Sequence, residues 1–169
     1  MCIRDRFTVD ANPNPTARTG AITLDSGVAL TVTQAGTNYM GPGPLVTLVS
    51  AGVSAPSGVA VDGSGNVYIA DTQNGAIEEW SAATQQVTPL VSGGLSQPLA
   101  VAVDGSGNVY IADTGNNAIK EWSPATPTNV VTLVTGLAGP SGVAVDGAGN
   151  VYFADTGNNA IKELSLIHI

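Results

Sequence analysis

The sequence contains one cysteine, one histidine and few charged residues, and each shortage removes a class of function. Cys2 and His168 stand near opposite ends of the 169 residues, so the long interior between them has neither side chain. Without them the interior cannot build a Cys–His nucleophile pair, a His general base or a His/Cys zinc site. We therefore do not expect catalysis by such groups from the interior.

Basic side chains and long apolar runs are also scarce. Five Lys and Arg stand against thirteen Asp and Glu, which gives a formal net charge of −8 and a pI near 4.1. A chain this acidic repels the phosphate backbone, so nucleic acid is not an expected partner. No apolar run approaches the roughly 20 residues that cross a bilayer, so we expect no membrane span in this stretch of protein.

The six residues at each end differ from everything between them. Residues 1–6 read MCIRDR and residues 164–169 read LSLIHI. A nucleotide sequence that encodes the first hexapeptide encodes the second on its opposite strand, so the pair resembles one sequencing adaptor translated in both directions. We expect both ends to be adaptor-derived. Residues 7–163 would then be a metagenomic fragment whose true termini and signal peptide lie elsewhere.

Glycine, valine and threonine are plentiful, and they recur in a repeat of 42 residues. VDGSGNVYIADT stands at 61–72 and again at 103–114, and VDGAGNVYFADT follows at 145–156. Apolar β-branched runs alternate with turns that contain Gly and Asn, which predicts four short strands per unit. In the first unit they are expected at 57–62, 66–72, 76–81 and 86–92. A four-stranded repeat of about 40 to 45 residues is the size of one β-propeller blade.

The repeats resemble a known family. PSGVAVDGSGNVYIADTQNGAIEEW, at residues 56–80, is similar to the NHL repeat, with its Pro-x-Gly-Val-Ala-Val-Asp strand, its Gly-Asn-Val-Tyr strand and a following Thr-Gly-Asn-Asn turn. The resemblance extends over 45–163, with units at about 51–92, 93–134 and 135–163. It implies an all-β fold, a partial β-propeller that has six blades when complete.

The residues before the first unit suggest three further segments. LVTLVS, at 45–50, resembles the fourth strand of a blade whose first three strands are absent, so both end blades are expected to expose apolar faces. Residues 7–36 resemble the closing hairpin of a BACON-type or related Ig-like module, with strands at 21–24 and 29–34. Residues 37–44 contain two prolines and two glycines and are predicted to be a linker.

Two aspartates recur in every unit. Asp62 opens a DGSGN turn whose oxygen ligands alternate as at the start of a calcium loop, but the later Gly and acid of such a loop are absent. Asp71 ends the second strand, and its three copies could suggest a metal or acid–base site, yet near-identical environments do not separate pKa values. We expect structural roles instead, a turn bond for the first and an Asx-type cap for the second. The structural set is Asp62, Asp71, Asp104, Asp113, Asp146 and Asp155.

Neutral polar residues occupy the loops after the second strands and between units. In a propeller these loops surround the central channel, so we expect them to form a polar binding face for a protein, a peptide or a glycan. The candidates are Ser57, Gln73, Asn74, Gln97, Asn116, Asn117, Ser141, Asn158 and Asn159. Tyr68 and Trp80, with their repeats, could stack on sugars or bases, but packing between blades is the expected role of aromatic residues within strands.

The resemblance also implies expectations about function. Some NHL propellers bind RNA through a basic face, but Ala76, Ala118 and Ala160 stand here where the family has Arg. We therefore expect a non-enzymatic interaction module, without cofactor or metal, from a secreted or otherwise extracytoplasmic bacterial protein. The alternative is a propeller lyase or lactonase whose metal ligands lie in blades outside this stretch.

Overall fold

The computed structural model describes residues 18–23, 29–34 and 45–165. These residues fall into two compact units, divided between Val46 and Thr47, and the units are treated separately below. Residues 1–6, 37–44 and 166–169, together with most of the predicted Ig-like segment, lie outside the described residues. The adaptor origin of the ends and the linker therefore stay predictions.

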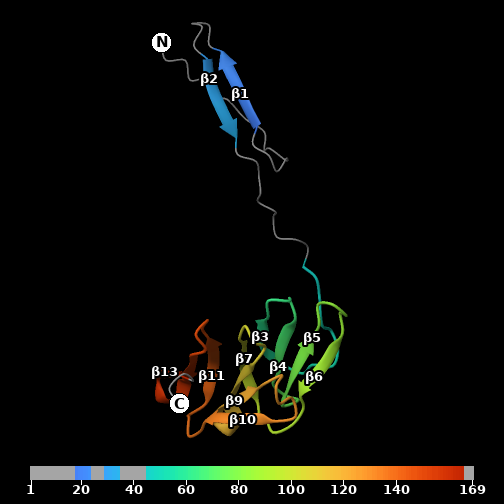
Figure 1. Cartoon of the computed structure of the whole chain (residues 1–169), viewed down its shortest axis with the longest axis vertical. Helices are drawn as coiled ribbons and strands as arrows, with labels where there is room; N and C mark the ends of the chain where they lie inside the picture. The colour runs from blue at the N-terminus through green and yellow to red at the C-terminus, as the bar shows by residue number, and fades with distance from the viewer. Residues whose placement is uncertain (1–17, 24–28, 35–44, 166–169) are drawn as a thin grey trace. The chain divides into compact units, whose positions relative to one another are not determined.

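The first unit contains an antiparallel hairpin. Its strands are β1 (Arg18–Thr23) and β2 (Ala29–Gln34), and they pair in a continuous register (Figure 1). The sequence predicted both strands, β2 with its observed bounds and β1 beginning later than it does. The likeness of this hairpin to a BACON or Ig-like module stays a prediction.

The second unit consists of three antiparallel sheets, one from each repeat, with the strands of each sheet paired in chain order. The first sheet contains β3 (Pro56–Val61), β4 (Val67–Asp71), β5 (Ala76–Trp80) and β6 (Val87–Val91). The second contains β7 (Pro98–Val103), β8 (Val109–Asp113), β9 (Ala118–Trp122) and β10 (Val130–Val134). The third contains β11 (Pro140–Val145), β12 (Val151–Asp155) and β13 (Ala160–Leu164).

The only other regular elements of the described residues are two short 3₁₀ turns, η1 (Thr114–Asn116) and η2 (Thr156–Asn158). Each follows the second strand of its sheet and ends on an Asn with positive φ, a conformation that Asn tolerates better than most residues. No helix of the described chain is long and apolar enough to cross a membrane. The all-β, partial-propeller fold predicted from the sequence is confirmed.

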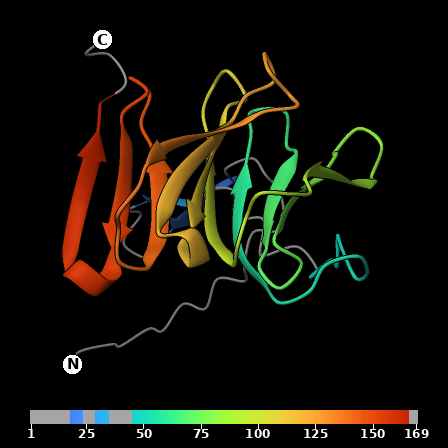
Figure 2. The same cartoon turned by 90° about the horizontal axis from the view of Figure 1, so that it is seen from below.

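The three sheets stand side by side in chain order (Figure 2). Their first strands are neighbours, since β7 contacts both β3 and β11. Each sheet therefore has one face toward the start of the stack and one toward its end, which we name the backward face and the forward face. This arrangement explains why β8, in the middle sheet, is a nearly continuous apolar run, because both sides of the strand are covered.

Two apolar clusters fill the spaces between the sheets. In the first, Tyr68, Ala70 and Ile77 on the forward face of the first sheet pack against residues of the second, including Val101 and Ile111. The second cluster repeats this contact one unit later. It joins the forward-face residues Tyr110, Ala112 and Ile119 to the backward-face residues Val151 and Phe153. The predicted packing role of the strand aromatic residues accords with these positions.

The outermost faces lack such cover. Val59 and Val61, on the backward face of the first sheet, are 66% and 60% exposed, and Ile161, on the forward face of the third, is 77% exposed. Ile77 and Ile119, its equivalents in the repeat, are both 0% exposed. The expected exposure of apolar residues at both ends of the stack is therefore observed.

The fourth-strand prediction for residues 45–50 is wrong as a statement of secondary structure. These residues form no strand, and Leu45 and Val46 are 101% and 66% exposed. A strand needs a neighbour to receive its hydrogen bonds, and no sheet of the described residues offers one here. The apolar pattern of the segment is real, but the pairing partner is absent.

Candidate functional site

The two sets of recurring aspartates lie at opposite ends of the same sheets. Asp62 and its equivalents stand between the first and second strands, whereas Asp71 and its equivalents end the second strand. We name the first end the hairpin edge and the second the loop edge. The loop edge gathers residues 72–75, 114–117 and 156–159 with the connections between sheets.

At the hairpin edge, the Asp62 carboxylate holds the turn together. Oδ1 accepts hydrogen bonds from the backbone N–H groups of Ser64 and Asn66, both at 2.9 Å. Oδ2 accepts from the Asn66 side chain at 2.9 Å and from the Tyr68 hydroxyl at 3.3 Å. Asp104 and Asp146 receive the same four bonds in their own units. Both carboxylate oxygens are thus occupied within the turn.

These bonds shift the pKa values of both partners. Burial pushes the pKa of Asp62 upward, but the hydrogen bonds from Asn66, Ser64 and Tyr68 outweigh it, so the pKa of Asp62 is lowered. Burial raises the pKa of Tyr68 to about 12, with the charges of Glu79 and Asp62 adding to the effect. A tyrosine held neutral beside a charged carboxylate is a hydrogen-bond donor, which suits a structural role.

At the loop edge, the Asp71 carboxylate is 0% exposed and binds a connection far away in the sequence. Its Oδ1 accepts a hydrogen bond from the backbone N–H of Ser54 at 2.8 Å, and its Oδ2 accepts one from the Asn74 side chain at 2.8 Å. Asp113 and Asp155 do the same with residues at the same spacings. The Asx-type cap is not what these carboxylates form, since η1 and η2 receive no side-chain cap bond.

Lysine completes the arrangement in the second and third repeats and is missing from the first. Lys120 Nζ lies 2.7 Å from Asp113 Oδ2, and Lys162 Nζ lies 2.6 Å from Asp155 Oδ2. In the first sheet the equivalent position is Glu78, and burial together with the charge of Asp71 raises the pKa of Glu78. The two lysines are therefore partners of buried carboxylates.

The hydrogen-bond donors around Asp155 make it a stronger acid. Hydrogen bonds from the Asn158 side chain, from Lys162 and from the Ala138 N–H lower its pKa to about 2. A general base or acid works best with a pKa near the working pH. This carboxylate stays ionised and occupied, as its structural position requires.

Several of the nine predicted ligand-face residues are used within the fold. Asn74, Asn116 and Asn158 each donate to the buried Asp three residues earlier, at 2.8 Å. Asn117 accepts a hydrogen bond from the Gly139 N–H at 2.9 Å. These side chains fix the loops, so their amide groups are not fully available to a ligand.

The two serine candidates are also engaged. The Ser57 hydroxyl lies 2.6 Å from Thr72 Oγ1 and donates to the carbonyl of Leu99 in the next sheet at 2.8 Å. Ser141 and Thr156 form the equivalent hydroxyl pair at 2.5 Å. Both serines are nevertheless exposed, so they line the loop edge while tying it together.

The remaining candidates present exposed side chains at the loop edge. Gln97 and Asn159 are exposed, and in the described part of the chain their side chains make no hydrogen bond. Gln73 is exposed and accepts one bond, from the Ser54 hydroxyl at 3.0 Å. These three amides come from three different connections on one edge, one each from 72–75, 92–97 and 156–159. They are the neutral groups best placed to meet a partner.

Sequence reasoning missed the bonds that join one sheet to the next at this edge. Thr72 Oγ1 donates to the carbonyl of Pro98 at 2.8 Å, and Thr114 Oγ1 donates to that of Pro140 at 2.5 Å. Both threonines follow the recurring Asp, and both prolines begin the next first strand. The constant 26-residue spacing from Thr to Pro was the signal that could have revealed these bonds.

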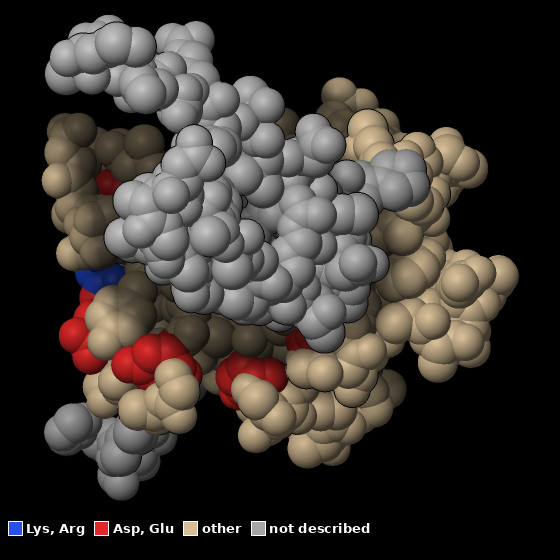
Figure 3. All heavy atoms as spheres, turned by 90° about the horizontal axis from the view of Figure 1, so that it is seen from above, with Lys and Arg blue, Asp and Glu red and all other residues tan. Residues whose placement is uncertain are grey.

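Charged residues are sparse on the surface. Figure 3 shows Asp and Glu in small separate patches, with uncharged residues forming much of the visible described surface. In the described ranges, no three His, Cys, Asp or Glu side chains come close enough together to hold a metal ion. The loop edge offers hydrogen bonding, with no group positioned as nucleophile and base.

Comparison with known proteins supports the repeat assignment. Residues 54–78 and 95–122 match the family model described as NHL repeat. No curated protein sequence matches the chain. The two matched segments begin in the connection before a first strand and extend into the third strand, one in the first sheet and one in the second.

Solved structures share the fold. A chain in the crystal structure of a nidogen/laminin complex matches with a TM-score of 0.57 and 26% identity over 64% of this chain and 42% of that one. Hydrazine synthase from Kuenenia stuttgartiensis matches with 0.59 and 22% over 71% and 35%. A catalytically inactive virginiamycin B lyase from Staphylococcus aureus, solved with quinupristin, matches with 0.57 and 17% over 89% and 46%. The chain spans less than half of each of these proteins.

Proposed function

We propose that this chain is a non-enzymatic interaction module of an extracytoplasmic bacterial protein, and that its loop edge binds a protein partner. The observation that carries the proposal is the exposed row of neutral amides, Gln73, Gln97 and Asn159, held on loops that buried aspartates fix in place. Loops of fixed geometry lose little conformational entropy on binding, which favours recognition. A peptide or a glycan is the alternative ligand for the same groups.

One comparison supports this choice, and a second bears on the fold alone. The solved chain from the nidogen/laminin complex, at 26% identity, belongs to a protein–protein assembly. The lyase shares 17% identity, which supports a common fold and nothing about chemistry. Among the described residues the aspartates are saturated with hydrogen bonds, so we place the function in contact rather than catalysis.

The test is a selection of binding proteins and peptides from a display library on the immobilised chain, followed by a comparison of two variants. The first variant carries Gln73→Lys, Gln97→Lys and Asn159→Lys on the loop edge. The control carries Ser64→Lys, Ser106→Lys and Ala148→Lys, which are exposed on the hairpin edge and add the same charge. Selected ligands should lose at least tenfold in affinity for the first variant and retain affinity for the control.

The opposite result is equally clear. Ligands that ignore the loop-edge variant, or lose affinity equally for both variants, would show that the loop edge is not the binding surface. A glycan array probed with the same three proteins decides between a protein and a carbohydrate ligand, because a glycan hit that depends on the loop edge would replace the protein proposal.

A further inference from the structure

The ion pairs of the loop edge define a site for one ammonium group. Lys120 Nζ lies 2.7 Å from Asp113 Oδ2 and donates a hydrogen bond to the carbonyl of Gly94 at 2.5 Å. Lys162 Nζ lies 2.6 Å from Asp155 Oδ2. Both aspartate side chains are 0% exposed, so each lysine supplies the positive charge that a buried carboxylate requires. The second and third repeats thus each hold a cation of their own at the same place.

The first repeat has the anionic part of this site without the cation. Asp71 is also 0% exposed, and among the described residues its Oδ2 accepts one hydrogen bond, from the Asn74 side chain at 2.8 Å. Asp113 Oδ2 receives the same amide bond and the lysine as well. One buried oxygen of the first repeat therefore lacks the charged donor that its equivalents have.

A second acid replaces the lysine. Glu78 stands 42 residues before Lys120. It pairs with Ile69 of β4, as the register of the repeat requires. Burial and the charge of Asp71 raise the pKa of Glu78, so the two carboxylates lie within electrostatic reach of each other. Two negative groups at the place of a cation repel each other, and a positive ligand between them would relieve the repulsion.

The carbonyl ligand of the site recurs as well. Gly52 stands 42 residues before Gly94, and both have the left-handed backbone conformation, with φ of 83° and 77°. Two residues after each glycine, a serine N–H anchors the connection to the buried aspartate, at 2.8 Å from Ser54 and at 2.7 Å from Ser96. The Gly52 carbonyl therefore has the position in which the Gly94 carbonyl binds an ammonium group.

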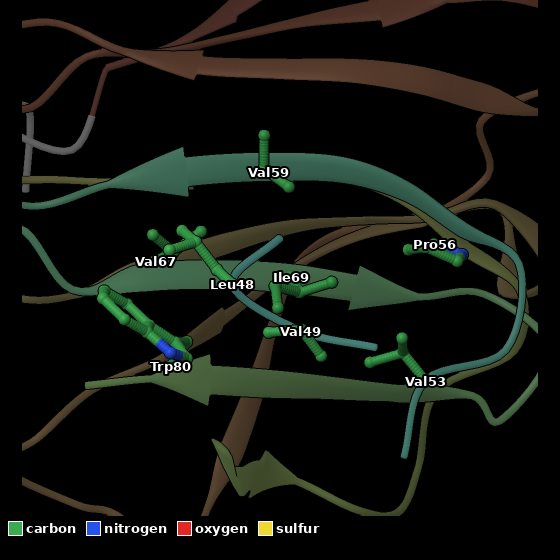
Figure 4. A pocket seen from close by; sticks show the side chains of 8 residues that line it. All are labelled: Leu48, Val49, Val53, Pro56, Val59, Val67, Ile69 and Trp80. Carbon is green, nitrogen blue, oxygen red and sulfur yellow. The ribbon is translucent and has the colours of Figure 1, made fainter. Parts of the chain in front are cut away.

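The groups of this site lie on one face of the first sheet. Val53 and Ile69 line one hollow on the backward face (Figure 4). Gly52 immediately precedes Val53 in the connection. Glu78 is paired with Ile69, and paired residues of neighbouring strands point to the same face, as does Asp71 two residues further along β4. Every group comes from the first repeat and the connection before it, so the site needs no other sheet.

The first repeat departs from the second only around this carboxylate. Residues 59–80 and 101–122 are identical except at three positions, where Gln73, Gly75 and Glu78 replace Gly, Asn and Lys. All three positions lie in the turn after Asp71 or at the start of the strand that follows it. Gln73 is one of the exposed amides of the loop edge. The exceptions to the repeat thus gather at one place, on the surface proposed to meet a partner.

We propose that the loop edge binds a primary ammonium group in the first repeat, between the Gly52 carbonyl and the carboxylates of Asp71 and Glu78. The three N–H donors of an ammonium match these three acceptors. The bound group takes the place that Lys120 Nζ fills one repeat later. A lysine side chain of the protein partner supplies it, and this last step alone rests on the proposed function of the loop edge.

The first experiment needs no partner. The full chain is titrated at neutral pH with n-butylammonium chloride, and the carboxyl carbons of Asp71 and Glu78 are followed by NMR. We expect saturable shifts at both carbons. The dissociation constant should be about tenfold lower than for butyltrimethylammonium, which has the same charge but no N–H to donate, because a hydrogen bond to a charged group contributes that much.

Three variants locate the binding. Glu78→Lys should abolish the response at Asp71, since the new lysine fills the site as Lys120 does. Glu78→Gln removes one acceptor charge without adding a cation and should weaken binding about tenfold. Glu79→Lys is the matched control, because it changes the net charge as Glu78→Lys does but pairs with Tyr68 on the other face, and it should retain binding. Circular dichroism shows that each variant still folds.

Several results would overturn the proposal. Equal affinities for the two probes would show a general ionic response, and binding that Glu78→Lys leaves unchanged would place the probe elsewhere. Tighter binding of Na⁺ or Ca²⁺ than of butylammonium would make this a metal site. Carboxyl carbons that titrate with pH but respond to neither probe would show that a shared proton takes the place of the cation.

The second experiment tests the source of the ammonium group. In peptides selected on the loop edge, each lysine is replaced in turn by norleucine. One replacement should lower affinity about tenfold for the unsubstituted chain and leave affinity for the Glu78→Lys chain unchanged. Selected peptides that depend on no lysine, while butylammonium still binds, would contradict the lysine as source. Ligands that ignore the loop edge while butylammonium binds would instead refute the proposed function and leave the ammonium site standing.

Discussion

At the scale of single residues, one buried carboxylate closes each of the three repeats upon itself. Asp71, Asp113 and Asp155 each bind the backbone N–H of a residue 17 positions earlier, at 2.7 to 2.8 Å. All three are 0% exposed, so water cannot replace a lost bond. A buried N–H without an acceptor costs about 1 to 3 kcal/mol, which explains why these aspartates serve the architecture.

The pKa of Asp155 makes stability depend on acid pH in a defined direction. Its pKa is lowered from 3.8 to about 2 in the folded protein. The unfolded chain therefore binds more protons between about pH 4 and about pH 2, so the contribution of this carboxylate is present above about pH 4 and is lost as the pH falls toward 2. Urea titrations across this range should show falling stability, with a shallower fall in Asp155→Asn.

The hydrogen bond from Asn158 is the largest cause of this low pKa. We therefore expect Asn158→Ala to raise the pKa of Asp155, measured from the chemical shift of its carboxyl carbon during an acid titration. Ser141→Ala is the control, because Ser141 belongs to the same edge but bonds to Thr156. An unchanged pKa in Asn158→Ala, or an equal change in the control, would contradict this assignment.

At the scale of strands, the close approach of β3 and β7 restricts one position. A Cβ on Gly58 would lie 2.7 Å from the carbonyl oxygen of Leu99 and 2.9 Å from the Cα of Ala100. These are backbone atoms and cannot rotate away. Gly142, the equivalent in β11, would place its Cβ at an ordinary 3.7 Å from the Ala154 side chain.

We therefore expect Gly58→Ala to lower the free energy of unfolding by about 1 to 3 kcal/mol, the usual range for overpacking. Gly142→Ala should change it by less than about 0.5 kcal/mol, as at sites with room for the added methyl. Urea unfolding of the two variants, at a dilution that keeps the chain monomeric, provides the comparison. Equal losses would show that the β3–β7 contact is looser than the structure indicates.

The strands were predictable because their signals are local and appear three times. The four strands expected in the first repeat match β3 to β6 to within one residue at every end. Gly and Asn at the turns, with β-branched residues between them, determine these bounds without any long-range contact. Repetition removed the ambiguity that one copy of a short apolar run would leave.

The failures involve partners that lie far along the chain. Residues 45–50 have strand composition but no strand to pair with among the described residues. The hydrogen-bond partner of Asp71 is the backbone N–H of residue 54. Because the bond uses the backbone, the type of residue at position 54 does not reveal it in the sequence. The amides of Asn74 and Asn116 look like exposed ligand groups in the sequence, and only the fold shows that each serves a buried carboxylate.

At the scale of the whole molecule, the position of a residue within the stack of sheets decides how much it contributes to the free energy of unfolding. Ile119 and Ile161 occupy the same place in the repeat, yet one is 0% and the other 77% exposed. Ile119→Ala should lower the unfolding free energy by about 3 kcal/mol, as for a buried side chain. Ile161→Ala should change it by less than about 1 kcal/mol when the chain is monomeric.

Urea unfolding of both alanine variants checks this prediction, and native-state hydrogen exchange extends it. The amides of β8 should be the slowest to exchange and those of β13 among the fastest, because stability in repeat arrays comes from contacts between neighbours. Equal losses from the two substitutions would mean that the third sheet is as well covered as the second.

The equivalence of successive interfaces has a genetic consequence. An in-frame tandem duplication of any 42 consecutive residues within 56–139 would add one complete repeat. The middle sheet already packs against a sheet on each side, so an added sheet of the same sequence would fit there too. Its buried aspartate would find its own N–H partner inside the copied segment or immediately upstream. Duplication or deletion of 42 codons can thus lengthen or shorten this protein in whole, foldable steps.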